Sequence, residues 1–479
     1  MKKRLLSLLL VLMLCISMLP VGQASAATGN ELQSFNAGQN FSDWAFMDLV
    51  TGDTYGLYPL SWYEGDMTRA ITTADMKWLL AGFRCKLLEM DGIQKAGYVS
   101  FKMPEKKTVE EVIGYLYDTA RDFTFATELP WGDTNAVSYA KENGIYTGKN
   151  GELGLKDICS YEQACVLAAR LVADIYDKLD ASSKGFLWET KANGNTVYML
   201  GSIHMADTKI YPFSGKIWDA YQSADVLGVE LNAFDTTGAM DLINMAVYTD
   251  GTTLKDHVSK ETYDKVVEFA QIFGVGEEQI SLMKPWYIYI SFSSLAVTGT
   301  GSVEEASQGA SLGIDMTFMT NALLTGKPIM ELEGYKGQAG MLDSFSDELE
   351  EYLLNDTIDS VLEVMEGTNK TSAAQGLNLM LDLWRKGDAE SFKQFTTFEY
   401  ETQDVVDDKM TDTERKLIQE YYDKLFTERN KTMAEYIEEL LKADGNKTYF
   451  VIVGSGHYLS DDSILDILDS KGYTITQIK

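Results

Sequence analysis

The order of hydrophobic and polar positions after Gly185 predicts strands that alternate with helices. Two apolar runs flank Asn193-Gly194 and predict a β-hairpin over 186–200, because Asn-Gly between two strand patterns is the strongest short hairpin signal. Further strand-like runs follow at 226–231, 328–332, 448–453 and 473–478. Strands that alternate with helices are typical of an α/β domain, which we place at 185–479.

Long helical patterns separate these strands. The clearest cover 341–366 and 411–442, and the second begins with a Thr-x-x-Glu capping box. We expect the helices between about 235 and 325, and again between 341 and 445, to form large insertions or a helical cap on the α/β domain.

The preceding stretch, 28–180, has a helical pattern of a different style. Helices are predicted to open at 41–44 and at 72–75, and the plan repeats as a helix over 136–144, a glycine-containing loop and a helix from 160. This helix–loop–helix plan resembles the surface-layer homology (SLH) repeat, and 105–123 resembles part of a degenerate middle unit. The arginine that this family uses to hold cell-wall polysaccharide is missing twice, so a degenerate structural domain and retained wall binding both stay open.

Composition and charge narrow the classes of partner. The chain has 479 residues, 45% of them hydrophobic, which excludes a disordered or collagenous protein and allows two or three domains. Lys and Arg number 41 against 72 Asp and Glu, for a net charge of −31. Such a surface repels phosphate backbones and anionic membranes, so we expect no nucleic-acid partner.

Residues 1–26 have the pattern of a signal peptide. A basic start, an apolar run over 5–19 and Ala24-Ser25-Ala26 as cleavage site predict export, with the product secreted or associated with the cell wall. Lipidation at Cys15 is the alternative, but Leu14 stands where a small residue is wanted. No later stretch is apolar enough to span a bilayer. The remaining three cysteines do not suggest a disulfide scaffold.

Histidine is scarce, and two of the three histidines share one local pattern. His204 and His457 each follow an apolar strand and a Gly-x-x spacing, so each stands at the carboxyl end of its strand, where open α/β sheets place their ligands. His257 follows a helix start and reads as an ordinary surface residue. The two strand-end histidines are therefore candidate functional residues.

A carboxylate ends a third strand. Glu230 closes the apolar run 226–229, and a charge in so apolar a place must be paired or must bind a cation. Two imidazoles and a carboxylate are a common ligand set for a divalent transition metal. The same groups can also act without a metal as general acids and bases.

These residues together resemble the TraB/GumN family, which includes the Tiki proteases. The resemblance covers 185–479 and follows an ordered set of segments: Leu200-Gly-Ser-Ile-His204, Tyr211-Pro212 with Ala220, Val229-Glu230, Gly313-Ile-Asp315, 327–333 with Gln338, Glu428-Arg429-Asn430 with Met433, and Gly454-Ser-Gly-His457. It implies a fold similar to erythromycin esterases and ChaN-type haem-binding proteins, and an active site made of the two histidines and the glutamate. Tiki members are metalloproteases that use manganese or cobalt.

We therefore expect metal-dependent hydrolysis, with a peptide bond as the expected substrate. His204, Glu230 and His457 would bind a divalent transition metal, by resemblance Mn or Co, with Zn possible; Glu230 is either a ligand or the general base. Arg429 is the candidate to hold a substrate carboxylate or stabilise an oxyanion, or else it forms an ion pair.

Asp315 and Glu333 are candidates to orient the histidines. A metal-independent esterase and a non-catalytic protein that binds haem or a wall component are the alternatives.

Overall fold

The computed structural model describes residues 40–96, 99–125, 135–148, 152–297, 302–367, 373–401 and 411–479. The predicted signal peptide and Cys15 lie outside these residues. The chain divides into two compact units, Ala27–Ser183 with Thr208–Gly215, and Lys184–Asp207 with Lys216–Lys479. Each unit is described by itself.

The N-terminal unit is mainly helical. Its elements are η1 (Asp43–Ala45), α3 (Phe46–Thr54), η2 (Leu60–Glu64), α4 (Thr73–Leu88), β1 (Ile93–Ala96), α5 (Val109–Arg121), β2 (Phe123–Phe125), α6 (Ala136–Glu142), α7 (Tyr161–Lys178) and η3 (Thr208–Ile210). Helices therefore start where the sequence predicted them. Thr72, Thr108 and Ser160 cap α4, α5 and α7 through their hydroxyls. The likeness to SLH repeats stays a prediction.

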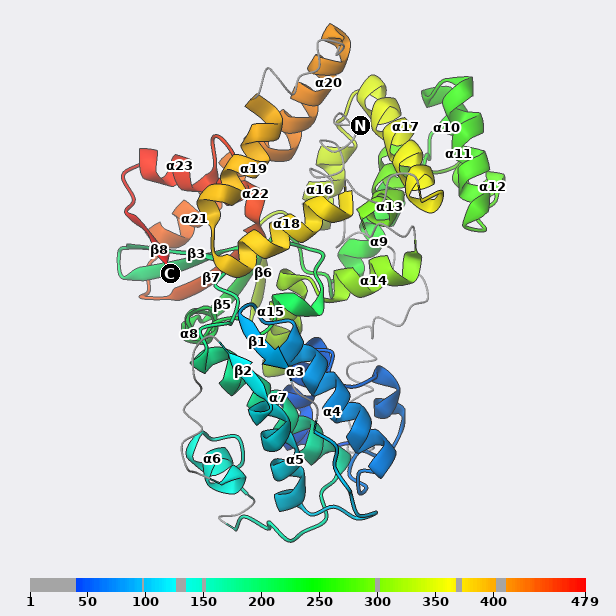
Figure 1. Ribbon diagram of the computed structural model, residues 1–479. Helices are drawn as coiled ribbons and strands as arrows, with labels where there is room; N and C mark the ends of the chain where they lie inside the picture. The colour runs from blue at the N-terminus through cyan, green and yellow to red at the C-terminus, as the bar shows by residue number, and fades with distance from the viewer. Residues whose placement is uncertain are drawn as a thin grey trace. The chain divides into compact units, whose positions relative to one another are not determined.

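The second unit is built on a mixed six-stranded sheet in the order β6-β5-β7-β4-β3-β8 (Figure 1). The strands are β3 (Phe186–Ala192), β4 (Asn195–Ser202), β5 (Val226–Val229), β6 (Ile329–Glu331), β7 (Thr448–Gly454) and β8 (Ile475–Ile478). β3 and β4 form the predicted hairpin, with Asn193 and Gly194 both at positive φ. β4, β7, β5 and β6 are parallel to one another. Their carboxyl ends therefore meet at one edge of the sheet.

Helices cover both faces of this sheet. On one face Phe450 of β7 contacts Tyr221 of α8 (Gly215–Ser223) and Phe318 of α15 (Ile314–Thr325). On the other face Phe186 of β3 contacts Trp384 of α18 (Ala373–Lys386). The core is a three-layer α/β arrangement, as the alternation of elements predicted.

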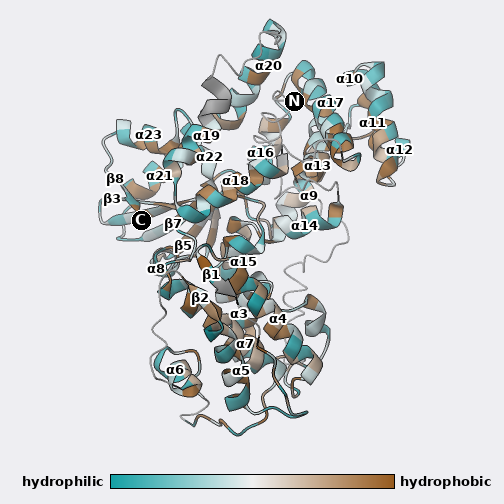
Figure 2. Cartoon of the chain, in the orientation of Figure 1, coloured by the Kyte–Doolittle hydropathy of each residue, from teal (hydrophilic) through white to brown (hydrophobic). Residues whose placement is uncertain are grey.

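The remaining helices fall mostly in the two stretches predicted as insertions, about 235–325 and 341–445. They are α9 (Thr236–Met245), α10 (Leu254–His257), α11 (Lys260–Ile272), α12 (Glu277–Ile280), α13 (Pro285–Val297), α14 (Val303–Ser311), α16 (Gly334–Leu342), α17 (Asp347–Met365), α19 (Ala389–Glu401), α20 (Asp412–Tyr422), η4 (Asp423–Thr427), α21 (Glu428–Lys442), α22 (Ser455–Leu459) and α23 (Ile464–Ser470). Their hydrophilic and hydrophobic sides can be followed in Figure 2.

Two helix predictions need correction in detail. The helix predicted over 341–366 is interrupted, because Ser346 caps a new helix, α17, and is itself held by Glu420. The helix predicted over 411–442 is continuous but contains a π-helical turn at Asp423–Thr427, between α20 and α21. Within the described part of the chain, no helix is long and apolar enough to cross a membrane.

Candidate active site

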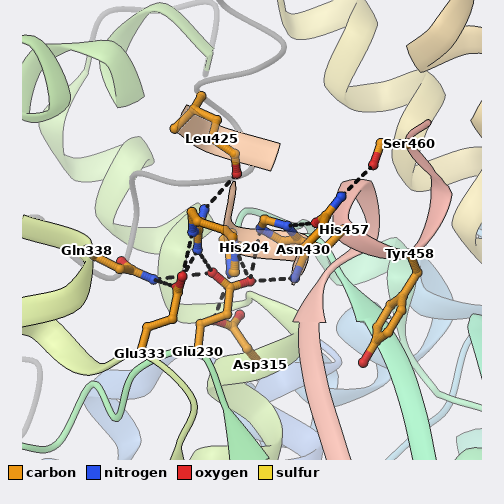
Figure 3. A network of polar contacts seen from close by, with 12 residues as sticks. His204, Glu230, Asp315, Glu333, Gln338, Leu425, Asn430, His457, Tyr458 and Ser460 are labelled. Carbon is orange, nitrogen blue, oxygen red and sulfur yellow. Dashed lines mark hydrogen bonds and ion pairs between the residues drawn. The ribbon is translucent and has the colours of Figure 1, made fainter. Parts of the chain in front are cut away.

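The predicted site residues follow the parallel strands at their common edge. His204 comes two residues after β4, Glu230 directly after β5 and Glu333 two residues after β6. His457 lies in α22, which begins where β7 ends. The order β6-β5-β7-β4 brings these segments side by side, and Figure 3 shows their side chains turned toward one another. Residues far apart in the sequence thus form one cluster.

Both histidines point their Nε2 atoms at the same carboxylate oxygen. Nε2 of His204 lies 3.9 Å and Nε2 of His457 4.0 Å from Oε1 of Glu230. These distances are too long for hydrogen bonds. Nε2 of His457 has no hydrogen-bond partner among the described residues, although its ring is fully buried.

The other nitrogen of each ring is held by an acceptor. Nδ1 of His204 lies 2.9 Å from Oδ2 of Asp315, and Nδ1 of His457 lies 2.7 Å from Oδ1 of Asn430. The amide nitrogen of Asn430 donates to Oγ of Ser460 and to the carbonyl oxygen of Asp462, so its oxygen must face the histidine. Nδ1 of His457 therefore carries the proton and its Nε2 presents a lone pair, and the carboxylate of Asp315 likewise accepts the Nδ1 proton of His204.

Gly454 leaves space between these groups. A Cβ atom at this position would lie 3.5 Å from Oε1 of Glu230, 3.5 Å from Nε2 of His204 and 3.6 Å from Cδ2 of His457. A methyl group would thus occupy the middle of the cluster. The glycine of the second Gly-x-x-His pattern keeps the space between the three donor groups free.

Arg429 of α21 binds two carboxylates. Its Nη2 donates to Glu230 and to Glu333, each at 2.6 Å, and its Nε donates to Glu333 at 2.7 Å. Glu230 also accepts from the backbone N–H of Gly454 at 2.6 Å, and Gln338 donates to both glutamates. These contacts fix the Glu230 carboxylate with Oε1 toward the histidines.

Burial and charge shift the pKa values of two members. Burial, reinforced by the positive charge of Arg429, lowers the pKa of His457 well below 6.5. Burial by itself would lower the pKa of Arg429, but the carboxylates of Glu333 and Glu230 outweigh it and raise the pKa above its usual value. The site therefore holds a neutral imidazole beside a permanent cation.

The charges of this buried cluster do not balance. Asp315, Glu230 and Glu333 supply three carboxylates, and one guanidinium, Arg429, is ion-paired with the two glutamates. Three negative charges against one positive charge leave an excess of negative charge whether or not His204 carries a proton. Burying uncompensated charge is costly unless a cation is nearby.

We tested whether these residues fit the divalent metal that the sequence predicted. As the side chains stand, no group of three or more His, Cys, Asp or Glu residues in the described parts of the chain is arranged to hold an ion. However, the separations of 3.9 and 4.0 Å are less than twice a metal–ligand bond of about 2.1 Å. The unpartnered Nε2 of His457, the acceptors at both Nδ1 atoms and the excess negative charge also suit a cation. The two imidazoles and the carboxylate therefore fit a divalent metal, provided that their side chains move slightly toward one another.

The remaining predicted residues have different places. Asp315 contacts His204, as expected of an orienting carboxylate, but Glu333 binds Arg429 rather than a histidine. Arg429 is a buried ion-pair partner, 5% exposed, so holding a substrate carboxylate would require that pair to open. His257 is half-buried, where it stacks on Tyr248 and bonds to Thr252.

Sequence reasoning assigned no role to two residues of the site. Asn430 supplies the acceptor for His457, and Gln338 links Glu230 to Glu333. Both stood in the segments that carried the family resemblance. The sequence did offer a signal for Asn430. It is a polar residue next to Arg429, on a helix face that is otherwise buried.

Comparison with known proteins gives matches to the second unit. The model of the TraB/PrgY/gumN family matches residues 186–477. "Metalloprotease TIKI1" of Danio rerio is 22% identical over 320 residues, which cover 60% of this chain and 62% of that protein. "Uncharacterized protein YbaP" of Escherichia coli (strain K12) is 25% identical over 145 residues, 30% of this chain and 51% of that protein. The chain thus spans less than two thirds of these relatives, and no solved structure matches it.

Proposed function

The chain belongs to the TraB/PrgY/gumN family, and from that premise we propose that its α/β unit is a metal-dependent hydrolase acting on peptide bonds. One observation carries the proposal. Two imidazoles direct their Nε2 atoms at a single carboxylate oxygen in a buried site with excess negative charge, and Nε2 of His457 has no hydrogen-bond partner among the described residues. The relatives described as metalloproteases support the reaction class, although they match at only 22% identity.

In this proposal the histidines hold the ion and other side chains hold the histidines. His204 and His457 would bind through Nε2, while Asp315 and Asn430 keep the protons on Nδ1. A bound divalent ion would polarise the scissile carbonyl and lower the pKa of a water. The two nitrogens and one oxygen suit Mn, Co or Zn, and the family resemblance favours Mn or Co.

Glu230 has two possible roles that the same geometry allows. Its Oε1 faces both Nε2 atoms, so it can complete the ligand set or accept a proton from water. Arg429 and the N–H of Gly454 keep that carboxylate in place. Arg429 is thus proposed to position Glu230 rather than to bind substrate in the resting site.

The test is hydrolysis of a mixture of unlabelled peptides by purified full-length protein, read by mass spectrometry. Cleavage should stop after chelation and return with Mn²⁺, Co²⁺ or Zn²⁺. His457→Ala should be inactive, and His257→Ala is the matched control because His257 lies outside the cluster. Absence of cleavage under every metal, with the fold intact, would contradict the proposal.

A second candidate is hydrolysis without a metal. The contact of 2.9 Å between His204 and Asp315 favours it, because a carboxylate behind an imidazole strengthens that imidazole as a general base. Esterase activity that survives chelation and is lost in Asp315→Asn would support this reading. A Soret band on haem titration, without hydrolysis, would instead indicate a haem-binding protein.

Export and wall association are proposed from the sequence alone. Residues 1–26 would be removed during export, and the N-terminal unit would either attach the enzyme to cell-wall polysaccharide or serve as a degenerate structural domain. Sedimentation of the purified protein with isolated cell walls would test the attachment, and recovery of all protein in the supernatant would contradict it.

A further inference from the structure

A small cavity lies beside the site, on the face of the sheet that α15 covers. It is lined by residues at the ends of β5 and β7, in the loop after β4 and in the helices α15 and α16: His204, Val229, Glu230, Leu231, Asp315, Gln338 and Ile452. Its volume is about 10 Å³, close to the room that one water molecule needs. His204 and Glu230 thus belong to the lining of this cavity, whereas His457 does not.

Two buried oxygen atoms of the lining residues lack a donor. Oδ1 of Asp315 and Oε1 of Gln338 have no hydrogen-bond partner in the part of the chain that the structure describes. Asp315 is 8% exposed and Gln338 only 2%. A buried acceptor without a donor destabilises the fold, so two such atoms among the lining residues of one cavity need an explanation.

The orientation of both groups is set by their other contacts. The amide nitrogen of Gln338 lies 3.2 Å from Glu230 and 3.3 Å from Glu333. Both carboxylates are paired with Arg429 and can only accept, so the amide oxygen has to face away from them. Asp315 likewise uses Oδ2 for His204, which leaves Oδ1.

We propose that this cavity is a binding site for a single water molecule, which donates one hydrogen to Asp315 and the other to Gln338. A water has the two donors that the two oxygens require, and it fits the volume. A hard cation such as Ca²⁺ takes six or more oxygen ligands, whereas three of the lining residues are Val229, Leu231 and Ile452. The inference stands whether or not the protein is a hydrolase.

The water closes a chain of hydrogen bonds through the site. The chain runs from His204 to Asp315, through the water to Gln338, and from Gln338 to Glu230. Gln338 is therefore a positioning residue for two groups at once. It orients Glu230 directly, and through the water it orients the carboxylate that holds His204.

A high-resolution crystal structure of the full-length protein tests the site. We expect an ordered peak about 2.7–3.0 Å from both Asp315 Oδ1 and Gln338 Oε1. A cavity without density would overturn the proposal. A peak about 2.0–2.4 Å from the oxygens would also overturn it, because such distances indicate a metal ion.

Substitution tests the role of Gln338 separately. Gln338→Leu should lose the water peak and shift the Nδ1 proton resonance of His204, because leucine has neither the acceptor oxygen nor the donor amide. Gln271→Leu is the matched control, since Gln271 is exposed on α11. An unchanged His204 resonance in a folded Gln338→Leu protein would show that Gln338 does not position His204. If that variant does not fold, the crystal structure of the unsubstituted protein still shows whether the water is bound.

Discussion

Replacement of Arg429 by methionine tests the ion pairs on which the geometry of the site depends. The substitution keeps much of the side-chain volume and removes the charge. Glu230 would retain the N–H of Gly454 at 2.6 Å and the amide of Gln338 at 3.2 Å, whereas Glu333 would retain only Gln338, at 3.3 Å. Two buried carboxylates would thus lose their shared cation.

The expected loss of stability is large because the pair is buried. Arg429 is 5% exposed and both glutamates are below a tenth exposed. Removing one partner of a buried pair typically costs about 3–5 kcal/mol, because the remaining charge is uncompensated. Lys265→Met is the control, since its pair with Asp359 is partly exposed and such pairs contribute about 1 kcal/mol or less.

Hydrogen exchange can measure this loss of stability in the α/β unit alone. The amides of β4 and β7 lie in the centre of the sheet, so their exchange reports opening of the α/β unit without the N-terminal unit. Arg429→Met should lower the opening free energy by about 3–5 kcal/mol, and adding Glu333→Met should recover part of it. If Arg429→Met costs no more than Lys265→Met, the buried ion pairs do not hold the site.

Three further predictions follow from the same contacts. Because the folded protein keeps His457 neutral while the unfolded chain gains its proton below about pH 6.5, stability should fall as the pH drops through that value, and urea unfolding of His457→Gln should show a weaker pH dependence. Glu230→Gln should keep its metal and lose about 10²–10⁴ of the rate if Glu230 is the base, whereas loss of metal would identify a ligand; metal content and turnover measured together distinguish the two. The fragment 185–479 should fold and bind metal by itself, and an insoluble or metal-free fragment would show that the boundary is wrong.

The sequence predicted the elements and the edge of the sheet where the candidate residues lie. Asn193-Gly194 marked the hairpin, and the two Gly-x-x-His patterns marked strand ends, because a turn after a strand is a local property of the chain. Once β4, β5 and β7 are parallel neighbours, the approach of His204, Glu230 and His457 follows from their positions after those strands. Their roles in catalysis stay predictions.

The pairing of charged and polar side chains did not follow from the pattern. Glu333 was expected near a histidine and instead binds Arg429, and the partner of His457 is the amide of Asn430. Such pairings depend on how the helix turns between α20 and α21, where a π-helical turn rotates the residues that follow it relative to those before it. The spacing of hydrophobic residues along the sequence does not reveal such a π-helical turn, so these pairings could not be predicted from it.

Calorimetric titration of Mn²⁺, Co²⁺ and Zn²⁺ into chelator-treated protein tests the metal site most directly. The account predicts about one ion bound per chain in the unsubstituted protein and in His257→Ala, with binding lost in His204→Ala and His457→Ala, because the Nε2 atoms of these two histidines are the proposed ligands. Equal binding by all four proteins, or no binding by any of them, would contradict a metal centre at this edge of the sheet.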